Sequence, residues 1–407
     1  MGALAEWRSF TPQQRSTFVA SFLGWTLDAF DFFLMVFILR AVAAEFGTNV
    51  KAVSVAVTLT LAMRPLGALM FGMLADRFGR RPVLMADIAL FSILELASAF
   101  APSLAVLLIL RAAFGFAMGG EWGIGASLTM ETIPPRARGV ASGLLQEGYA
   151  CGYLLAAVVY GLLFETIGWR GMFAVGVLPA LLVLYIRRNV QESPAWQRIR
   201  ARPRRSLGAV LSGRAGLFLY VVVLMTAFNF FSHGTQDLYP TFLQAQRGLP
   251  TRTVSAIAII ANLGAIVGGI AFGMLSQRIG RRRAIVLAAL LALPIIPLWG
   301  FSASVVLLGL GAFLMQIAVQ GAWGVIPVHL NELSPDEVRG TFPGFAYQLG
   351  NLLASANAVL QAGFAADRGG DYALALAVVA ASAAVAIALL TAVGPEAHGV
   401  EFGAGQA

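Results

Sequence analysis

The chain has 407 residues, of which 58% are hydrophobic and only 12% are charged, and it carries a formal net charge of +8. A soluble domain has about 25% charged residues, and so few charges cannot cover this much apolar surface in water. The composition therefore excludes a water-soluble protein and favours a membrane protein, whose spanning helices each need about 20 apolar residues.

Apolar runs of span length follow one another along the whole chain. We predict twelve transmembrane helices, each bounded by charged residues or by proline and glycine. The start of the chain has no short apolar core followed by a cleavage site, so we expect the first span to be retained. The predicted spans cover residues 17–41, 51–75, 83–101, 104–131, 137–164, 169–187, 214–246, 251–277, 284–302, 304–332, 338–366 and 371–394.

One long polar stretch separates the sixth and seventh spans. It divides the chain into an N-terminal six-helix bundle, residues 1–187, a cytosolic linker, residues 188–213, and a C-terminal six-helix bundle with a short cytosolic tail, residues 214–407. Most of the 28 Lys and Arg residues fall on the linker's side of the membrane, and the positive-inside rule places that side, with both termini, in the cytosol. The basic residues therefore mark topology rather than nucleic-acid binding. The linker arginines are Arg198, Arg200, Arg202, Arg204 and Arg205.

The two halves repeat each other at a constant offset of 201 residues, from Gly72 to Gly273. Segment 72–81 recurs as 273–282, and Trp122-Gly123 recurs as Trp323-Gly324. Two parallel six-helix repeats resemble the major facilitator transporters, in which cargo binds between the halves. The glycine- and arginine-rich segment 72–81 also resembles the signature of that superfamily between spans two and three. The resemblance implies an all-α membrane protein with the major facilitator fold.

The duplicated hairpin is expected to latch a gate on the cytosolic face. Its glycines permit a tight reversal, and the carboxylate of Asp76 is suited to engage arginines and a helix N-terminus. The second copy has Gln277 at this place. A purely structural turn is the alternative for the individual arginines. At the span ends we expect Glu131 to pair with Arg138 and Glu332 with Arg339. The predicted gating residues are Asp76, Arg77, Arg80, Glu131, Arg138, Glu332 and Arg339.

Ionisable side chains inside the spans are costly unless they face a partner or a water-filled cavity, so each is a functional candidate. They gather in the first half, opposite amides or small residues of the second. Arginine binds carboxylates through a bidentate fork, and a nearby acid is able to titrate, so the pattern suits an anionic cargo and a proton. Arg64 is our candidate for the carboxylate anchor, with an ion pair to Asp28 or Asp31 as the alternative. We expect Arg111 to pair with an acid such as Glu121. The proton-coupling candidates are Asp28, Asp31, Glu121 and His233.

The seventh span holds the densest group of polar residues. Asn229, Ser232, His233 and Gln236 recur at i, i+3, i+4 and i+7, so one helix face presents all four, with Asp237 at its edge. Pro240 follows, where it frees a backbone carbonyl and is expected to allow a kink. Tyr347, Gln348, Asn351 and Ser355 form a similar face in the eleventh span. These faces predict a cargo site, with hydrogen bonding between helices as the alternative.

The run from Asn229 to Thr241 resembles the signature of the Jen-type lactate/pyruvate proton symporters, within the sialate/proton symporter family. The resemblance implies symport of a proton with a short monocarboxylate such as lactate, pyruvate, acetate or propionate. A larger organic acid, such as sialic acid or an aromatic acid, is the alternative, although the short linker favours small acids over sialic acid. The substrate-binding residues that the resemblance implies are Arg64, Asn229, His233, Gln236, Asp237, Gln348 and Asn351.

Other functional classes fit the sequence less well. It contains no phosphate loop, no nucleophile motif and no cluster of Cys or His with metal-ligand spacing, so we expect no enzyme activity, no cofactor and no metal. A cation or sugar carrier of the same fold, a receptor and a channel are the weaker alternatives. The expected partners are a small organic anion, a proton and the lipid bilayer, with no nucleic acid, for a monomer in the cell inner membrane.

Overall fold

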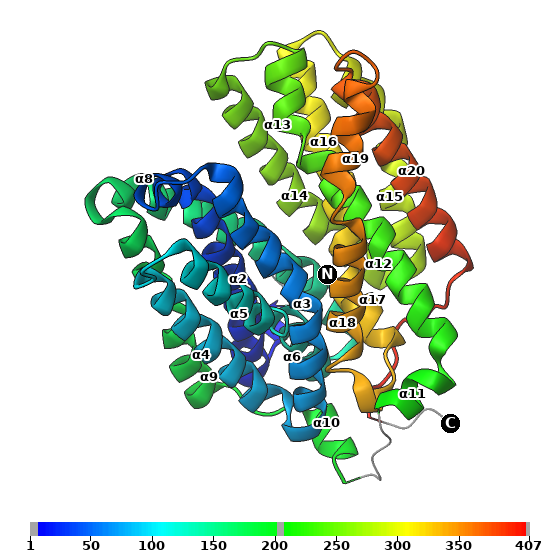
Figure 1. Cartoon of the computed structure of the whole chain (residues 1–407). Helices are drawn as coiled ribbons and strands as arrows, with labels where there is room; N and C mark the ends of the chain where they lie inside the picture. Colours follow the sequence, from blue (N-terminus) through cyan, green and yellow to red (C-terminus); the bar gives the residue numbers. More distant parts are fainter. Residues whose placement is uncertain (1–6, 202–206, 404–407) are drawn as a thin grey trace.

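The computed structural model describes residues 7–201 and 207–403, and in these ranges the regular secondary structure is helical. The helices form two bundles that lie side by side (Figure 1). The first bundle consists of α2 (Pro12–Glu45), α3 (Val50–Phe78), α4 (Arg80–Ala99), α5 (Leu104–Met118), α6 (Glu121–Thr132), α7 (Arg138–Gln146), α8 (Gly148–Val175) and α9 (Pro179–Asn189). The second consists of α12 (Ala215–Gln236), α13 (Tyr239–Thr241), η2 (Phe242–Gln246), α14 (Thr251–Ile279), α15 (Arg281–Phe301), α16 (Val305–Trp323), α17 (Ile326–Leu333), α18 (Phe342–Ala354), α19 (Asn357–Ala366) and α20 (Tyr372–Val393).

The predicted twelve crossings are confirmed. Among the described residues, nine segments are long and apolar enough to span a membrane. One of them, Pro135–Asn189, is 55 residues long and bends at Gly168, whose φ of 63° interrupts the helix, so it supplies two crossings. The other two crossings are α2 and the pair α18 and α19. The apolar runs therefore located every spanning helix to within a few residues.

The duplicated sequence folds into duplicated structure. Helix α3 begins at Val50 and α14 at Thr251, again 201 residues apart, and α4 and α15 keep the same offset. Gly79 and Gly280 separate these helices with φ values of 111° and 93°, a backbone conformation that favours glycine. The two hairpins thus have the same geometry because glycine occupies the turn in both copies.

Breaks interrupt several crossings near the middle of the bundles. Helix α12 ends at Gln236, and the chain resumes as α13 and η2, where Pro240 lies in the first turn of α13. The sequence predicted a kink at this proline, whereas the structure ends α12 before it, so that Pro240 starts the next turn. Helices α7 and α8 meet at Glu147. Such breaks expose backbone polar groups where cargo and ions bind in membrane transporters.

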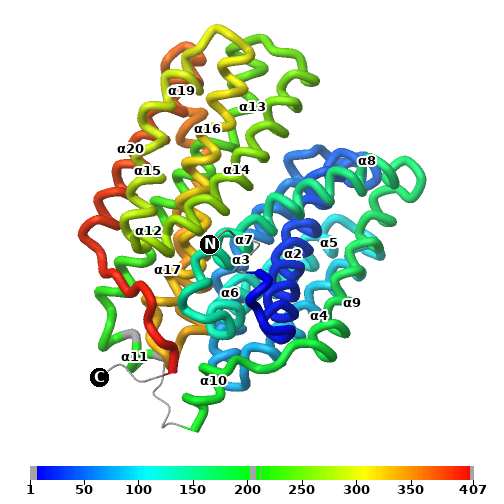
Figure 2. The backbone as a smooth tube through the Cα atoms, turned by 180° about the vertical axis from the view of Figure 1, so that it is seen from behind, coloured from blue at the N-terminus to red at the C-terminus, as the bar shows by residue number. Residues whose placement is uncertain are grey.

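The bundles approach each other at one end and separate at the other (Figures 1 and 2). The close end, called the linker end below, carries α10 (Pro194–Ile199) and α11 (Leu207–Gly213). The opposite end is called the far end. The predicted linker is therefore partly helical, and Arg198 and Arg200 are exposed on it. Arg202, Arg204 and Arg205 lie outside the described residues.

Candidate functional site

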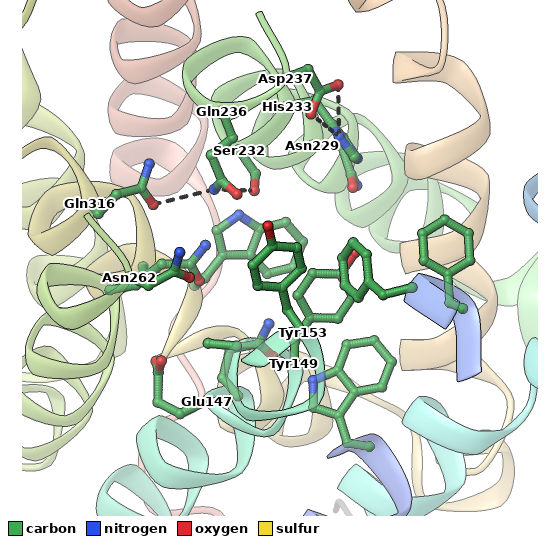
Figure 3. Close-up of a pocket in the computed structure, with 18 of the residues that line it drawn as sticks. Glu147, Tyr149, Tyr153, Asn229, Ser232, His233, Gln236, Asp237, Asn262 and Gln316 are labelled. Atoms are coloured by element: carbon green, nitrogen blue, oxygen red, sulfur yellow. Dashed lines mark hydrogen bonds and ion pairs between the residues drawn. The ribbon is translucent and has the colours of Figure 1, made fainter. Parts of the chain in front are cut away.

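A cavity of about 540 Å³ lies between the two bundles. Both bundles contribute to its wall, and polar side chains of the second bundle face aromatic rings of the first (Figure 3). The first bundle supplies Trp25, Phe32, Phe33, Leu61, Gln146, Glu147, Tyr149, Ala150 and Tyr153, and the second supplies Asn229, Ser232, His233, Gln236, Asp237, Asn262, Ala265, Gln316, Gln320, Trp323 and Tyr347.

The polar face predicted on the seventh span points into this cavity. All five of its residues, from Asn229 to Asp237, line the wall. Gln236 donates to Ser232 Oγ at 3.1 Å and to Gln316 Oε1 at 3.3 Å. These bonds link α12 to α16 and fix the amide at the cavity surface, where its oxygen is available to a ligand. The helical spacing of these residues was thus a sufficient guide to their common direction.

His233 is held between two oxygen atoms. Its Nδ1 lies 3.2 Å from a carboxylate oxygen of Asp237, and its Nε2 lies 3.3 Å from Asn351 Oδ1. An imidazole that faces acceptors on both sides satisfies both only when both nitrogens carry hydrogen, as in the imidazolium ion. Among the described residues, the cavity wall contains no lysine or arginine, so His233 is its one basic side chain in that part of the chain.

Aromatic rings form the opposite wall. The ring of Tyr149 lies 5.4 Å from Trp25 and 5.3 Å from Phe33, and Phe33 lies 4.8 Å from Tyr153. Below them, Tyr347 of the second bundle is 4.7 Å from Trp122 of the first, so aromatic contacts also join the bundles. Rings at these centroid distances present faces and edges on which a planar ligand stacks.

Besides Tyr149 and Tyr153, the sequence prediction missed four amides of the cavity wall, Gln146, Asn262, Gln316 and Gln320, and it included Glu147 only among the ionisable candidates of the spans. Each amide lies inside an apolar run, which is the signal that would have found it. The prediction on the eleventh span is met only in part. Asn351 contacts His233, whereas Gln348 is buried outside the cavity wall and Ser355 is exposed.

Arg64 lies in a buried ion pair. Its Nη2 is 2.9 Å from Asp28 Oδ2, the two residues are 3% and 0% exposed, and neither lines the cavity. The ion pair considered as the alternative is therefore the arrangement that the structure contains. The pairing expected for Arg111 is wrong, because its partner is Glu95 at 2.7 Å rather than Glu121. Glu95 reaches it from the adjacent helix α4.

Three further carboxylates of the first bundle are buried without hydrogen-bond partners. They belong to Asp31, Asp87 and Glu121, all 0% exposed. Together with Asp28 and Glu95 they form a group of five buried carboxylates, of which two are paired with a buried arginine, Asp28 with Arg64 and Glu95 with Arg111. Because a buried, unpaired charge is strongly unfavourable, the excess carboxylates are expected to hold protons in this state.

The first hairpin joins the bundles at the linker end. Asp76 Oδ1 accepts a hydrogen bond from the backbone of Gly340 at 2.7 Å, and Oδ2 accepts from the backbone and hydroxyl of Thr341 at 3.0 and 2.6 Å. In the second copy, Gln277 Oε1 accepts from the backbone of Gly139 at 2.9 Å. The substitution of glutamine for aspartate therefore preserves the contact, since either side chain supplies the acceptor oxygen.

The span-end ion pairs exchange partners between the bundles. Arg138 lies 3.8 Å from Glu332, and Arg339 lies 3.7 Å from Glu131, whereas we expected each pair within one bundle. Within the bundles, these acids bind the hairpin arginines instead: Arg80 is 3.0 Å from Glu131, and Arg281 is 2.9 Å from Glu332. The expectation failed because sequence distance gives no information on contacts between halves.

Arg77, another predicted gating residue, is exposed, and its guanidinium lies over the Phe78 ring at 5.2 Å.

The C-terminal tail covers this ion-pair network. The Phe402 ring is 2% exposed and lies 3.6 Å from the guanidinium of Arg138 and 3.9 Å from that of Arg339. Arg138 also donates to the carbonyl of Val400 at 2.6 Å. One tail residue thus contacts an arginine from each bundle. The sequence prediction assigned no role to the tail.

A model of the family described as Major Facilitator Superfamily matches residues 18–358. The chain belongs to the major facilitator superfamily. This membership makes it a multi-pass membrane transporter rather than an enzyme. The fold agrees, since a solved structure of the superfamily's proton:xylose symporter XylE matches with a TM-score of 0.79 at 20% identity, over 95% of this chain and 97% of that one.

Two curated members of the superfamily are similar in sequence over most of their length. A probable 4-methylmuconolactone transporter of Cupriavidus pinatubonensis is 34% identical, over 87% of this chain and 85% of the relative. The sialic acid transporter NanX of Escherichia coli is 30% identical, over 86% of each chain. Both relatives carry organic acids or their lactones by name, and neither name specifies lactate or pyruvate.

Proposed function

We propose that this chain is a proton-coupled symporter of an organic acid with a ring or a conjugated planar part. The observation that carries the proposal is the two-sided cavity, with aromatic rings on one wall and His233 among amides on the other. In this assignment, the planar part of the cargo stacks on Tyr149 and Tyr153, and its carboxylate approaches His233. The alternative raised by the sequence, an aromatic or larger organic acid, thereby becomes the leading one.

The size of the cavity supports a larger cargo. Its volume of about 540 Å³ lies within the range of roughly 300–1,000 Å³ that is typical of sites for drug-sized ligands. A three-carbon acid would leave most of this space to water and would not contact both walls. The named cargoes of the relatives, a muconolactone and sialic acid, are also larger than lactate.

A short monocarboxylate such as lactate or pyruvate is the second candidate. One observation favours it: Asn229, His233, Gln236 and Asp237, which carry the resemblance to the lactate/pyruvate symporters, all line the cavity. In that case the carboxylate and the hydroxyl or keto oxygen would bind on the α12 wall alone, and the aromatic wall would exclude water.

The buried charges of the first bundle are the proposed site of proton coupling. Asp28 pairs with Arg64, and Asp31 lies nearby without a hydrogen-bond partner. Protonation of Asp28 would release Arg64, whose positive charge would then attract the cargo carboxylate towards the first bundle. Loading of both proton and anion would keep the site neutral, which lowers the cost of moving the bundles past each other.

Transport itself is proposed to follow the rocking of two bundles around a central site. The linker end is held closed by Asp76, Gln277 and the exchanged ion pairs. Opening this end requires that these contacts break together while contacts form at the far end. If the linker lies in the cytosol, as the charge distribution predicts, the present conformation faces outward.

The test uses purified protein in liposomes with an acidic outside. Uptake of labelled nicotinate or benzoate, of a muconolactone, of sialic acid and of lactate would be compared with and without a protonophore. Accumulation of a ring-containing acid, abolished by the protonophore and competed weakly by lactate, is the expected result. Accumulation of lactate alone would favour the second candidate, a carrier of short monocarboxylates. Uptake that does not depend on the pH gradient would exclude proton coupling.

A further inference from the structure

The floor of the cavity contains a carboxylate to which the proposed transport cycle gives no role. Glu147 lies at the break between α7 and α8, is 5% exposed and lines the cavity. Its Oε1 is buried and has no hydrogen-bond partner. A buried acceptor without a partner is uncommon and calls for an explanation.

Glu147 rests on the backbone of the opposite bundle. A methyl group on Gly269 of α14 would collide with Oε1 of Glu147 and would lie 3.0 Å from its Cδ. Further towards the linker end, a methyl group on Gly273 would lie 2.9 Å from the Cα of Gly143 and 2.6 Å from the carbonyl of Gly139. We call these four glycines the glycine seam. Helices α7 and α14 meet there backbone to backbone, and Glu147 closes the end of the seam at the cavity.

No cation faces Glu147 among the residues that the structure describes. Helix α14 presents Gly269 and Asn262, α16 presents Gln320, and α2 presents Trp25. On its own helix, the titratable neighbour is Cys151, whose thiol carries no charge when protonated. An ionised carboxylate in this position would be buried without a counter-ion, which is strongly unfavourable. The closed seam therefore accepts Glu147 as the neutral acid.

The second copy of the repeat supports this assignment. The residue equivalent to Glu147 at the offset of 201 is Gln348, which is 1% exposed in α18, and α18 packs on α3 of the other bundle. Glutamine has nearly the shape of protonated glutamate but is always neutral. One of the two equivalent positions is thus permanently neutral, whereas the other becomes neutral only by binding a proton.

We propose that Glu147 is the residue that ties proton binding to closure of the linker end. The glycine seam closes on the protonated acid, and loss of the proton favours its opening, because the carboxylate would otherwise stay buried without a counter-ion. This inference rests on the proposed proton symport and adds the step at which the proton controls the position of the bundles. Low pH favours the closed seam, and high pH favours the open one.

The experiment measures the distance between the bundles at the linker end as a function of pH. Spin labels would be attached through Arg188→Cys and Arg278→Cys, two exposed positions in opposite bundles, after Cys151→Ser has removed the native thiol. In the parent, the distance is expected to lengthen from about pH 5.5 to about pH 8.5 as a buried carboxyl titrates. In Glu147→Gln it stays short at both. Equal lengthening in Glu147→Gln, or none in the parent, would overturn the proposal.

Glycine variants separate this role from a general effect on packing. Gly269→Ala is expected to hold the seam open at both pH values, because its methyl group displaces the carboxylate, and added Glu147→Ala should restore closure. Gly161→Ala, where the new methyl group meets no atom within 4 Å, is the matched control and should behave as the parent. The distances need no cargo, so failure of proton-driven uptake and failure of this inference are distinguishable.

Discussion

The α12 wall of the cavity places one basic residue among neutral amides. His233 is oriented by Asp237 on one side and by Asn351 on the other, so its ring is held at the surface that a cargo carboxylate would approach. The arginine expected to take this role, Arg64, is paired with Asp28 behind the wall. In the proposed site, a protonated His233 would therefore be the positive charge nearest to the cargo.

Replacement of His233 by glutamine is predicted to weaken cargo binding. Glutamine retains a hydrogen-bond donor but no charge, and a hydrogen bond to a charged group is worth about 1.5–3 kcal/mol, so the KM for the organic acid should rise about tenfold or more. Initial rates of uptake in liposomes give the KM. Ser355→Ala, an exposed position on the eleventh span, should leave it unchanged. An unchanged KM in His233→Gln would show that the histidine does not bind the cargo.

Substitutions of Arg64 and Asp28 are predicted to have non-additive effects on the stability of the protein. Removing one partner of a buried ion pair costs about 3–5 kcal/mol, whereas removing both is often neutral. We expect Arg64→Ala to lower the melting temperature of the purified protein and Asp28→Asn with Arg64→Ala to recover part of the loss. Both variants should fail to accumulate cargo. Independent, additive effects on stability would show that the pair does not act as a unit.

At the scale of the elements, contacts between the bundles depend on short segments at the linker end. The hairpin between α3 and α4 reaches the start of α18 through Asp76, and its copy between α14 and α15 reaches α7 through Gln277. The tail after α20 adds a third contact through Phe402. The contacts at the linker end therefore come from two symmetric elements and one that the repeat does not contain.

Removal of the Phe402 ring is predicted to loosen the linker end. Its two cation–π contacts are each worth about 0.5–2 kcal/mol, so Phe402→Ala should shift the ratio of open to closed molecules by about tenfold. The spin labels at positions 188 and 278 report this ratio. His398→Ala changes an exposed residue of the same tail and serves as the control. If both variants give the distances of the parent, the tail does not hold the gate.

At the scale of the whole molecule, a cavity lies between the two bundles, which are joined by a basic linker. Arg198 and Arg200 are exposed at the linker end. The excess of basic residues on this side favours a cytosolic location, because loops rich in lysine and arginine are retained there. The closed end would then face the cytosol, and the cavity would be reached from outside.

This orientation is predicted to appear as one-sided labelling. With Cys151→Ser as background, Arg200→Cys at the linker end should react with a membrane-impermeant maleimide only in inverted vesicles. Ala303→Cys, exposed between α15 and α16 at the far end, should react only in right-side-out vesicles. The reverse pattern would contradict the assignment of the linker to the cytosol.

Much of the architecture was predictable from the chain. The spans follow from apolar length, the two bundles follow from the offset between Gly72 and Gly273, and the face from Asn229 to Asp237 follows from helical spacing. The partners of individual charges did not follow. Arg111 binds Glu95, and Arg138 binds Glu332, because which helices become neighbours is decided by packing over long sequence distances.

The sequence by itself determined that the chain folds in a lipid bilayer, how many times it crosses the membrane, that its two halves repeat, and which helix face carries the polar residues. These depend on local composition and period, which act within one helix. Only the tertiary structure decided that Arg64 is paired behind the cavity wall and that Glu147 lies against Gly269 of the other bundle. Such contacts join helices far apart in the chain, and their energies depend on burial and distance, which a linear pattern does not contain.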